Sequence, residues 1–219
     1  MGLDPVGGLL TIIFASLLPF AAVMVTSFAK IVIVMGLLKN ALGLPQIPPA
    51  IVTNGLALIL SAFIMAPVLQ KGADSIVQSA SGPSAGSNRQ SIDVMKTFNE
   101  IKEPLRDFLS YHTTPQQREF FLTSATKTWP PAMRDALDDK HLMVLIPAFS
   151  ISEINKAFKI GFLLYLAFVI VDLIVANILL ALGMSMMQPT MISAPVKLLL
   201  FVAADGWNRL VQLLVLSYQ

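Results

Sequence analysis

Long apolar runs at both ends of the chain enclose a polar middle. From Pro5 to Ala29 there are 25 residues without a charge, and a second charge-free run extends from Asn40 to Gln70. A helix of about 20 apolar residues is long enough to cross a bilayer. Because apolar runs return after the polar middle, the pattern predicts an all-α membrane protein. Two long helical hairpins, 1–70 and 142–219, would enclose a small inserted α-helical polar domain, 71–141, within a single domain of residues 1–219.

Glycine and proline mark the turn of each expected hairpin. Ala41-Leu42-Gly43 and Ala181-Leu182-Gly183 each end an apolar run, and prolines follow both. Glycine just past a helix and proline in the first turn of the next are the usual punctuation. The first hairpin should return as a helix near Pro49 to Leu69. The second should join the runs Ile160–Leu182 and Met191–Leu216. The similar turns suggest a weak internal repeat.

Three local features refine these helices. The N-terminus has no basic region, so the first run reads as a retained membrane helix, with a kink predicted at Pro19. Lys30 lies in the apolar surroundings of Phe28–Leu38, so the helix should continue past it. Leu142–Ser152 is apolar but too short to span, and charged residues follow it.

The polar middle has the pattern of short amphipathic helices. Apolar residues from Val94 to Phe108 recur at spacings of three and four, and Pro104 could kink that helix. Thr114-Pro115 has the form of a cap followed by proline at the first helical position. Trp129-Pro130-Pro131 should turn the chain into a short helix, and Gly82–Asn88 has the composition of a loop.

Composition limits the function. The chain is 55% hydrophobic and 13% charged, and 18 of its 28 charges lie between Lys71 and Lys140, nine basic and nine acidic. A net charge of +2 gives no basic surface for nucleic acid. There is no cysteine, and His112 and His141 have no clustered acidic partner. With no phosphate-binding glycine loop either, we expect no enzyme, no metal and no cofactor.

Five charged residues lie inside apolar runs where lipid would be expected: Lys30, Asp172, Lys197, Asp205 and Arg209. A charge at mid-bilayer costs about 2.5–3.5 kcal/mol on insertion scales, so such residues usually face protein or water. They could pair structurally, for instance Asp172 with Lys197, or they could form a proton or ion relay. Alternatively, these helices could pack mainly against other subunits. The broken hairpins and buried charges also leave open a small-molecule or ion secondary transporter.

Motifs along nearly the whole chain resemble the FliP/SctR export-gate family of type III secretion systems. The polar middle matches least. The motifs are Leu18-Pro19-Phe20, Thr26–Lys30, Asn40–Pro49, Asn54–Leu58, Phe63–Pro67, Pro147-Ala148-Phe149, Ser152-Glu153, Ala157–Phe162, Asp172-Leu173, Leu182-Gly183-Met184, Pro195–Leu198 and Asp205-Gly206-Trp207.

The resemblance implies a subunit present in five copies in a conical gate that conducts unfolded proteins across the inner membrane of a Gram-negative bacterium. Its partners would be a small two-helix subunit, one larger subunit, the inner rod or needle proteins, the secreted substrates and membrane lipid. The gate would project into the periplasm. Because the chain starts almost directly at its first helix, the resemblance favours the virulence-associated injectisome branch. It also implies that the charged residues contact other helices and subunits.

In this family a methionine-rich loop lines the closed pore, and the match falls on Met184, Met186 and Met187. Gly183 and Pro189 would act as hinges that keep the loop from extending either helix. An unbranched thioether is apolar enough to exclude water and flexible enough to conform to a passing polypeptide. Ser185 interrupts the methionine run, which leaves the role of Met184 open. Alternatively, the methionines only fill gaps against neighbouring side chains.

Overall fold

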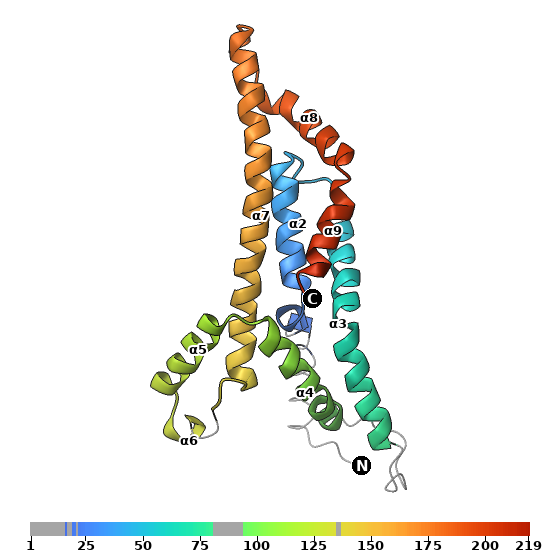
Figure 1. The fold of residues 1–219 in the computed structure, drawn as a ribbon, viewed down its shortest axis with the longest axis vertical. Helices are drawn as coiled ribbons and strands as arrows, with labels where there is room; N and C mark the ends of the chain where they lie inside the picture. The colour runs from blue at the N-terminus through green and yellow to red at the C-terminus, as the bar shows by residue number, and fades with distance from the viewer. Residues whose placement is uncertain (1–15, 17–18, 21, 81–93, 135–136) are drawn as a thin grey trace. The chain divides into compact units, whose positions relative to one another are not determined.

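The described part of the chain is helical. A computed structural model (Figure 1) describes residues 16, 19–20, 22–80, 94–134 and 137–219, and its regular elements there are all helices. This confirms the predicted all-α class. Most of the run Pro5–Ala29 and all of the loop Gly82–Asn88 lie outside the described residues, so those two predictions stay untested.

Among the described residues, two helices are long and apolar enough to cross a membrane, α3 and α7, and a bent pair, α8 with α9, would make a third span. The labelled helices are α2 (Phe28–Ala41), α3 (Ala50–Ala80), α4 (Val94–His112), α5 (Pro115–Thr128), α6 (Pro131–Arg134), α7 (Leu142–Ala181), α8 (Pro189–Ala203) and α9 (Gly206–Leu216).

The run Leu142–Ser152, too short to span by itself, is continuous with the apolar run that follows it. It forms the first turns of α7, a single helix of 40 residues (Figure 1). The polar residues that seemed to end the apolar run lie inside the protein: Ser152 and Glu153 are each 1% exposed. Ser152 Oγ donates to the carbonyl of Ala148, one turn earlier, at 2.7 Å. Since these polar groups are accommodated within the fold, they do not interrupt the helix.

The last apolar run is two helices, because the chain bends by 65° between α8 and α9. Asp205 has a left-handed backbone (φ 53°, ψ 43°) and precedes the first residue of α9. A Cβ at Gly206 would overlap the ring of Phe201. That ring also packs edge-on against Trp207, with 5.4 Å between centroids. Asp205 and Gly206 therefore allow a corner that a larger residue at 206 would obstruct.

Helix α2 begins after a break at Thr26 and Ser27. Residues 22–25 are helical, and the amide of Phe28 donates to Thr26 Oγ1 at 3.4 Å before α2 starts. Lys30 lies inside α2 as expected, and the helix runs on to Ala41. The break was not anticipated. The kink predicted at Pro19 stays a prediction, since residues 17–18 and 21 are outside the described part.

The chain divides into two compact units. Unit 1 comprises Met1–Ala29 and Met65–Glu153, and unit 2 comprises Lys30–Ile64 and Ile154–Gln219. In unit 1, α4 packs on the first turns of α7 through Leu109, Leu145 and Phe149, which are fully buried. Partly buried apolar residues surround this cluster: Val25, Leu105, Phe108, Leu142 and Ile146.

Unit 1 also confirms the short helices predicted in the polar middle. Helix α5 starts at Pro115 with Thr114 before it, and α6 starts at Pro131. The junction of α4 and α5 is held to α7, because the amide of Thr114 donates to Ser152 Oγ at 3.2 Å. Pro104 lies within α4 without ending it.

In unit 2 the two turns at Gly43 and Gly183 have the same backbone structure, which confirms the local repeat. Gly43 and Gly183 have φ values of 76° and 75°. After α2, the amide of Leu44 donates to Lys39 O at 3.0 Å. After α7, the amide of Met184 donates to Leu179 O at 2.9 Å. Both bonds are those of a Schellman motif, which needs a left-handed residue past the helix.

Candidate functional site

The methionine tip, residues 184–188 between α7 and α8, is closed at its start by Gly183. The amide of Gly183 donates to Leu180 O at 3.0 Å and that of Met184 to Leu179 O at 2.9 Å. These bonds satisfy carbonyls that the end of a helix leaves without partners. A side chain at Gly183 would be strained at its φ of 75°. The chain therefore leaves α7 sharply and in a defined direction.

Pro189 fixes the other end of the tip. It is the first residue of α8, where a missing amide hydrogen costs nothing. Gln188 before it is extended (φ −70°, ψ 119°), and the amide of Met187 donates to Met184 O at 3.1 Å. Gly183 and Pro189 thus lie where each helix meets the tip, at the positions predicted for hinges.

The three methionines differ in exposure. The Met186 side chain is 99% exposed, against 38% for Met184 and 40% for Met187. Met186 therefore projects from the tip with almost no contact to its own chain. A single thioether so exposed in water would be unusual for a residue that only fills a gap, since a gap-filling residue is enclosed by its neighbours.

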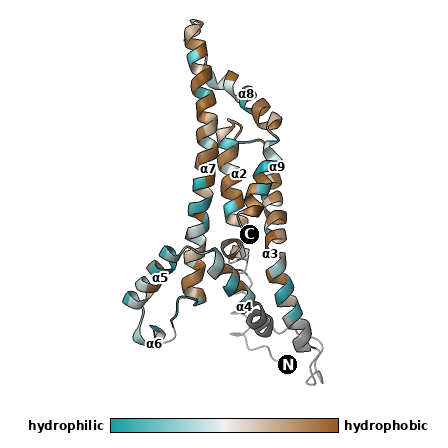
Figure 2. Cartoon of the chain, in the orientation of Figure 1, coloured by the Kyte–Doolittle hydropathy of each residue, from teal (hydrophilic) through white to brown (hydrophobic). Residues whose placement is uncertain are grey.

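Met184 turns towards an apolar groove between α7 and α8, about 510 Å³ in volume. Both helices that flank the groove are mainly hydrophobic (Figure 2). Its lining has no polar residue: Val171, Ile174, Val175, Ile178, Leu179, Leu182, Met184, Ile192, Val196 and Leu200. Met184 is thus in a different environment from Met186.

Asp172 and Lys197 form the ion pair that the sequence suggested across the second hairpin. Lys197 Nζ lies 2.6 Å from Asp172 Oδ2 and also donates to the backbone carbonyl of Ala41 at 3.0 Å. Lys197 is 4% exposed, while the Asp172 side chain is 34% exposed. Two strong acceptors therefore surround a buried ammonium, as a charge removed from water requires.

One polar atom of this pair and one on the neighbouring turn of α8 have no hydrogen-bond partner within the described residues. They are Asp172 Oδ1 and Ser193 Oγ, both buried. Ser193 lies one turn before Lys197 on α8, so both side chains are on the same side of that helix. Asp172, Lys197 and Ser193 are therefore a small group of polar side chains in an otherwise apolar hairpin.

The other three charged residues of the apolar runs lie apart from this pair. Lys30 is fully buried in α2, with Nζ 3.6 Å from the centre of the Tyr218 ring, a cation–π contact. Asp205 is exposed and accepts from Asn208 Nδ2 at 2.9 Å and 3.0 Å, and Arg209 is exposed. The structure thus joins two of the five charges and leaves two at the surface of the chain.

Sequence reasoning missed two partners of these charges, the carbonyl of Ala41 and the ring of Tyr218. It also missed the buried hydroxyl of Ser193, which has no hydrogen-bond partner within the described residues. A backbone carbonyl leaves no mark in a sequence, and Tyr218 is far from Lys30 along the chain. Ser193 had a usable signal, because it is four residues before Lys197 on a helix that is otherwise apolar.

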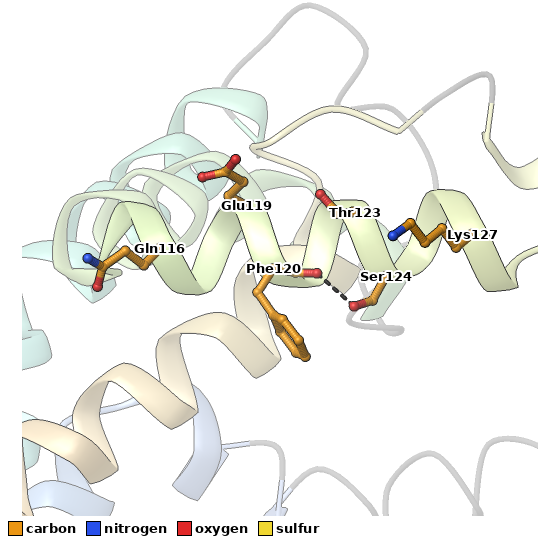
Figure 3. A pocket seen from close by; sticks show the side chains of 6 residues that line it. All are labelled: Gln116, Glu119, Phe120, Thr123, Ser124 and Lys127. Atoms are coloured by element: carbon orange, nitrogen blue, oxygen red, sulfur yellow. Dashed lines mark hydrogen bonds between the residues drawn. The ribbon is translucent and has the colours of Figure 1, made fainter.

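A second hollow, about 370 Å³, lies on the exposed face of α5 in unit 1 (Figure 3). All its lining residues belong to that one helix: Gln116, Glu119, Phe120, Thr123, Ser124 and Lys127. Ser124 Oγ donates to the carbonyl of Phe120 at 2.7 Å, and the Phe120 ring is 60% exposed. The hollow is a shallow surface feature, and none of the predicted site residues lines it.

Comparison with known proteins identifies relatives over the whole chain. A family model described as "FliP family" matches residues 9–214. "Pathogenicity-related ORF2" of Xanthomonas campestris pv. glycines is 48% identical, with all of both chains covered. "Hypersensitivity response secretion protein HrcR" of Ralstonia nicotianae is 47% identical over 93% of each chain. "Yop proteins translocation protein R" of Yersinia pestis is 44% identical over 98% of this chain and 97% of its own.

Proposed function

The chain belongs to the FliP family, and on that premise we propose that it is a subunit of the export gate of a type III secretion system. The family is a structural component of secretion machinery. Names such as "secretion protein HrcR" and "Yop proteins translocation protein R" belong to relatives at 47% and 44% identity. Because these relatives match nearly the whole chain, their names support the injectisome branch.

The proposed location is the bacterial inner membrane. α3 and α7 are each long and apolar enough to cross it, and the bent pair α8–α9 could be a third span. Five copies of the chain would surround the path of unfolded substrates and would project into the periplasm. A small two-helix subunit, one larger subunit and the rod or needle proteins would complete the assembly.

Exposed apolar residues on unit 2 support an assembly in which neighbouring subunits cover these helices. On α3, Ile51 is 82% and Ile59 67% exposed, and on α8 Leu199 is 69% exposed. Arg209 and Asp205 lie at the surface of the same unit. Charged groups at the surface of an apolar helix are stable where a partner protein or water receives them. We propose that these two residues contact neighbouring subunits.

The observation that carries the pore proposal is the 99% exposure of Met186 at the end of a conformationally fixed tip. In a ring of five copies, five such side chains would meet at the axis. Thioethers would form an apolar constriction that excludes water and ions, and their rotatable bonds would let it conform to a polypeptide. Met187 would join this ring, whereas Met184 would pack behind it, in the groove between α7 and α8.

The transporter alternative has less support. It needs a substrate to bind at Asp172, but Lys197 Nζ already lies 2.6 Å from Asp172 Oδ2. The groove beside the tip is lined by apolar residues alone and offers no polar group to orient a small polar substrate.

Replacing Met186 and Met187 with alanine tests the seal. We expect the assembled complex to form, because both side chains make few contacts within the chain. Ion conductance through the closed gate should rise, because shorter side chains leave the constriction open to water. The measurement is conductance of the purified complex in a planar bilayer.

Met133→Ala is the matched control, since Met133 is 49% exposed on α6 and is not one of the residues proposed to line the pore. It should leave conductance at the wild-type level. A double variant that assembles and conducts no more than wild type would contradict the seal.

A further inference from the structure

Lys197 joins three segments of unit 2 at one point. From α8, its Nζ reaches Asp172 Oδ2 on α7 at 2.6 Å and the carbonyl of Ala41, at the end of α2, at 3.0 Å. Lys197 is 4% exposed; its bond to Ala41 is buried, and its bond to Asp172 is partly buried. Hydrogen bonds with a charged donor are shorter and stronger than neutral ones. The side chain therefore ties α8 to two other helices.

The carbonyl of Ala41 is available because of the sequence of the first tip, residues 43–49. In a continuing helix the amide of residue 45 would donate to this carbonyl. Residue 45 is proline, which has no N–H to donate. The tip amides of Leu42, Gly43 and Leu44 donate instead to carbonyls of residues 38–40. Carbonyls at the end of a helix carry partial negative charge, so an ammonium is a favourable partner.

The first tip is a stiff anchor for this bond. It contains Pro45, Pro48 and Pro49, each with a fixed φ, and is closed by Gly43 in its Schellman turn. Helix α8 lies directly against it, since a Cβ on Gly43 would be 3.5 Å from Ala194 Cβ. The methionine tip contains no proline; it is bounded by Gly183, in the same kind of Schellman turn, and by Pro189, the first residue of α8.

Direct packing between α7 and α8 near the methionine tip is incomplete. The apolar groove of about 510 Å³ lies between the two helices, from Val171 to Leu200. Atoms that line a void lose dispersion contacts on that side. The two bonds of Lys197 are therefore specific polar links from α8 to α7 and α2, in addition to the apolar contact between the rings of Phe168 and Phe201, whose centroids are 6.3 Å apart.

We propose that Lys197 is a positioning residue that fixes α8, and through α8 the methionine tip, to the first tip. This inference rests on the proposed role of the methionine tip in the gate. The bond to Ala41 holds α8 in place, and Asp172 neutralises the buried ammonium. Of the two similar helix turns, the first tip provides the fixed point, and the position of the methionine tip depends on its link to the first tip through Lys197.

A spin label on the tip tests this directly. Because the chain has no cysteine, Ser185→Cys provides a single labelling site in the assembled complex. The double variant Asp172→Asn with Lys197→Met removes both charges together, so neither is left buried alone. We expect it to convert the label's spectrum from immobilised to mobile. Asp172→Glu alone keeps a negative charge beside Lys197 and leaves the bond to Ala41 in place, so the label should stay immobilised.

The control is a label at Thr123→Cys on α5, which no variant should mobilise. The proposal is overturned if the label at 185 stays immobilised in the double variant. It is also overturned if Asp172→Glu alone mobilises the label equally, because Lys197 can still make both of its bonds in that variant. Conductance of the same samples separates the two proposals: a mobilised tip without added leakage would support the positioning role and contradict the seal.

Discussion

At the scale of single residues, Gly183 sets the direction of the methionine tip. Its φ of 75° lets two tip amides return to the carbonyls of Leu179 and Leu180. An L-residue with a Cβ pays about 1–2 kcal/mol for this conformation. The cost is local, because nothing lies within 4 Å of a Cβ built at Gly183.

Gly183→Ala should therefore lower the free energy of unfolding of the complex by about 1 kcal/mol, through backbone strain alone. Gly36→Ala is the matched control: Gly36 lies inside α2, and a Cβ there also meets nothing within 4 Å. It should be neutral or stabilising by about 0.5–1 kcal/mol. Chemical denaturation in detergent measures both. Equal effects of the two variants would contradict the assigned role of Gly183.

Residue-scale prediction succeeded where chemistry forces a partner. An aspartate and a lysine placed in neighbouring apolar runs are costly to leave in lipid, and an ion pair lowers that cost, so pairing Asp172 with Lys197 could be predicted. The second acceptor, Ala41, could not be predicted, because a free carbonyl depends on how the helix ends. The roles of Met184, Met186 and Met187 stay predictions.

At the scale of elements, close contact between α2 and α7 depends on Gly161. A Cβ at this position would overlap Leu37 Cδ1 and lie 3.0 Å from Leu37 Cβ. Inserting a methyl group into a packed contact forces side chains or backbone to shift. The absence of a side chain at Gly161 thus sets how closely the two helices approach.

Gly161→Ala should destabilise the complex by about 1–3 kcal/mol. Adding Leu37→Ala should recover part of this loss, because the overlapping atoms are then absent. Thermal unfolding of the two single variants and the double variant gives the coupling between the sites. Strictly additive losses would show that the contact does not limit the approach of the helices.

Element boundaries were predicted well where glycine and proline mark them and poorly elsewhere. Pro115 and Pro131 each begin a helix as expected. The predicted end near Leu69 was wrong, because α3 continues to Ala80. The continuity of α7 past Ser152 was missed, because burial of polar groups depends on tertiary packing. The corner at Asp205 was missed for the same reason, since the Phe201 ring fills the space beside Gly206.

At the scale of the whole molecule, the length of α7 bears on how the chain meets the membrane. Its 40 residues extend about 60 Å at 1.5 Å per residue, twice the roughly 30 Å of a hydrocarbon core. A large part of this helix must therefore lie outside lipid. Apolar residues such as Phe162, at 63%, and Leu163, at 67%, are exposed along the helix, and those that lie outside lipid need protein partners. This agrees with the proposed multi-subunit gate.

The division of the chain into one domain, and the stoichiometry of five, stay predictions at this scale. Sequence patterns gave the helical class and the membrane helices because both follow from the length of apolar runs. The assembly of subunits cannot be predicted in this way, because surfaces buried between subunits and surfaces facing lipid are equally apolar.

Cross-linking to a stalled substrate is the most direct test of the central claim that the methionine tip encircles the exported chain. In the cysteine-free protein, Met186→Cys places one thiol at the end of the tip, and Thr123→Cys on α5 serves as the control. A substrate carrying a folded plug and one cysteine in its unfolded segment is trapped in the gate and oxidised. We predict a disulfide from position 186 and none from position 123. Absence of a cross-link at 186 from a trapped substrate would contradict the account.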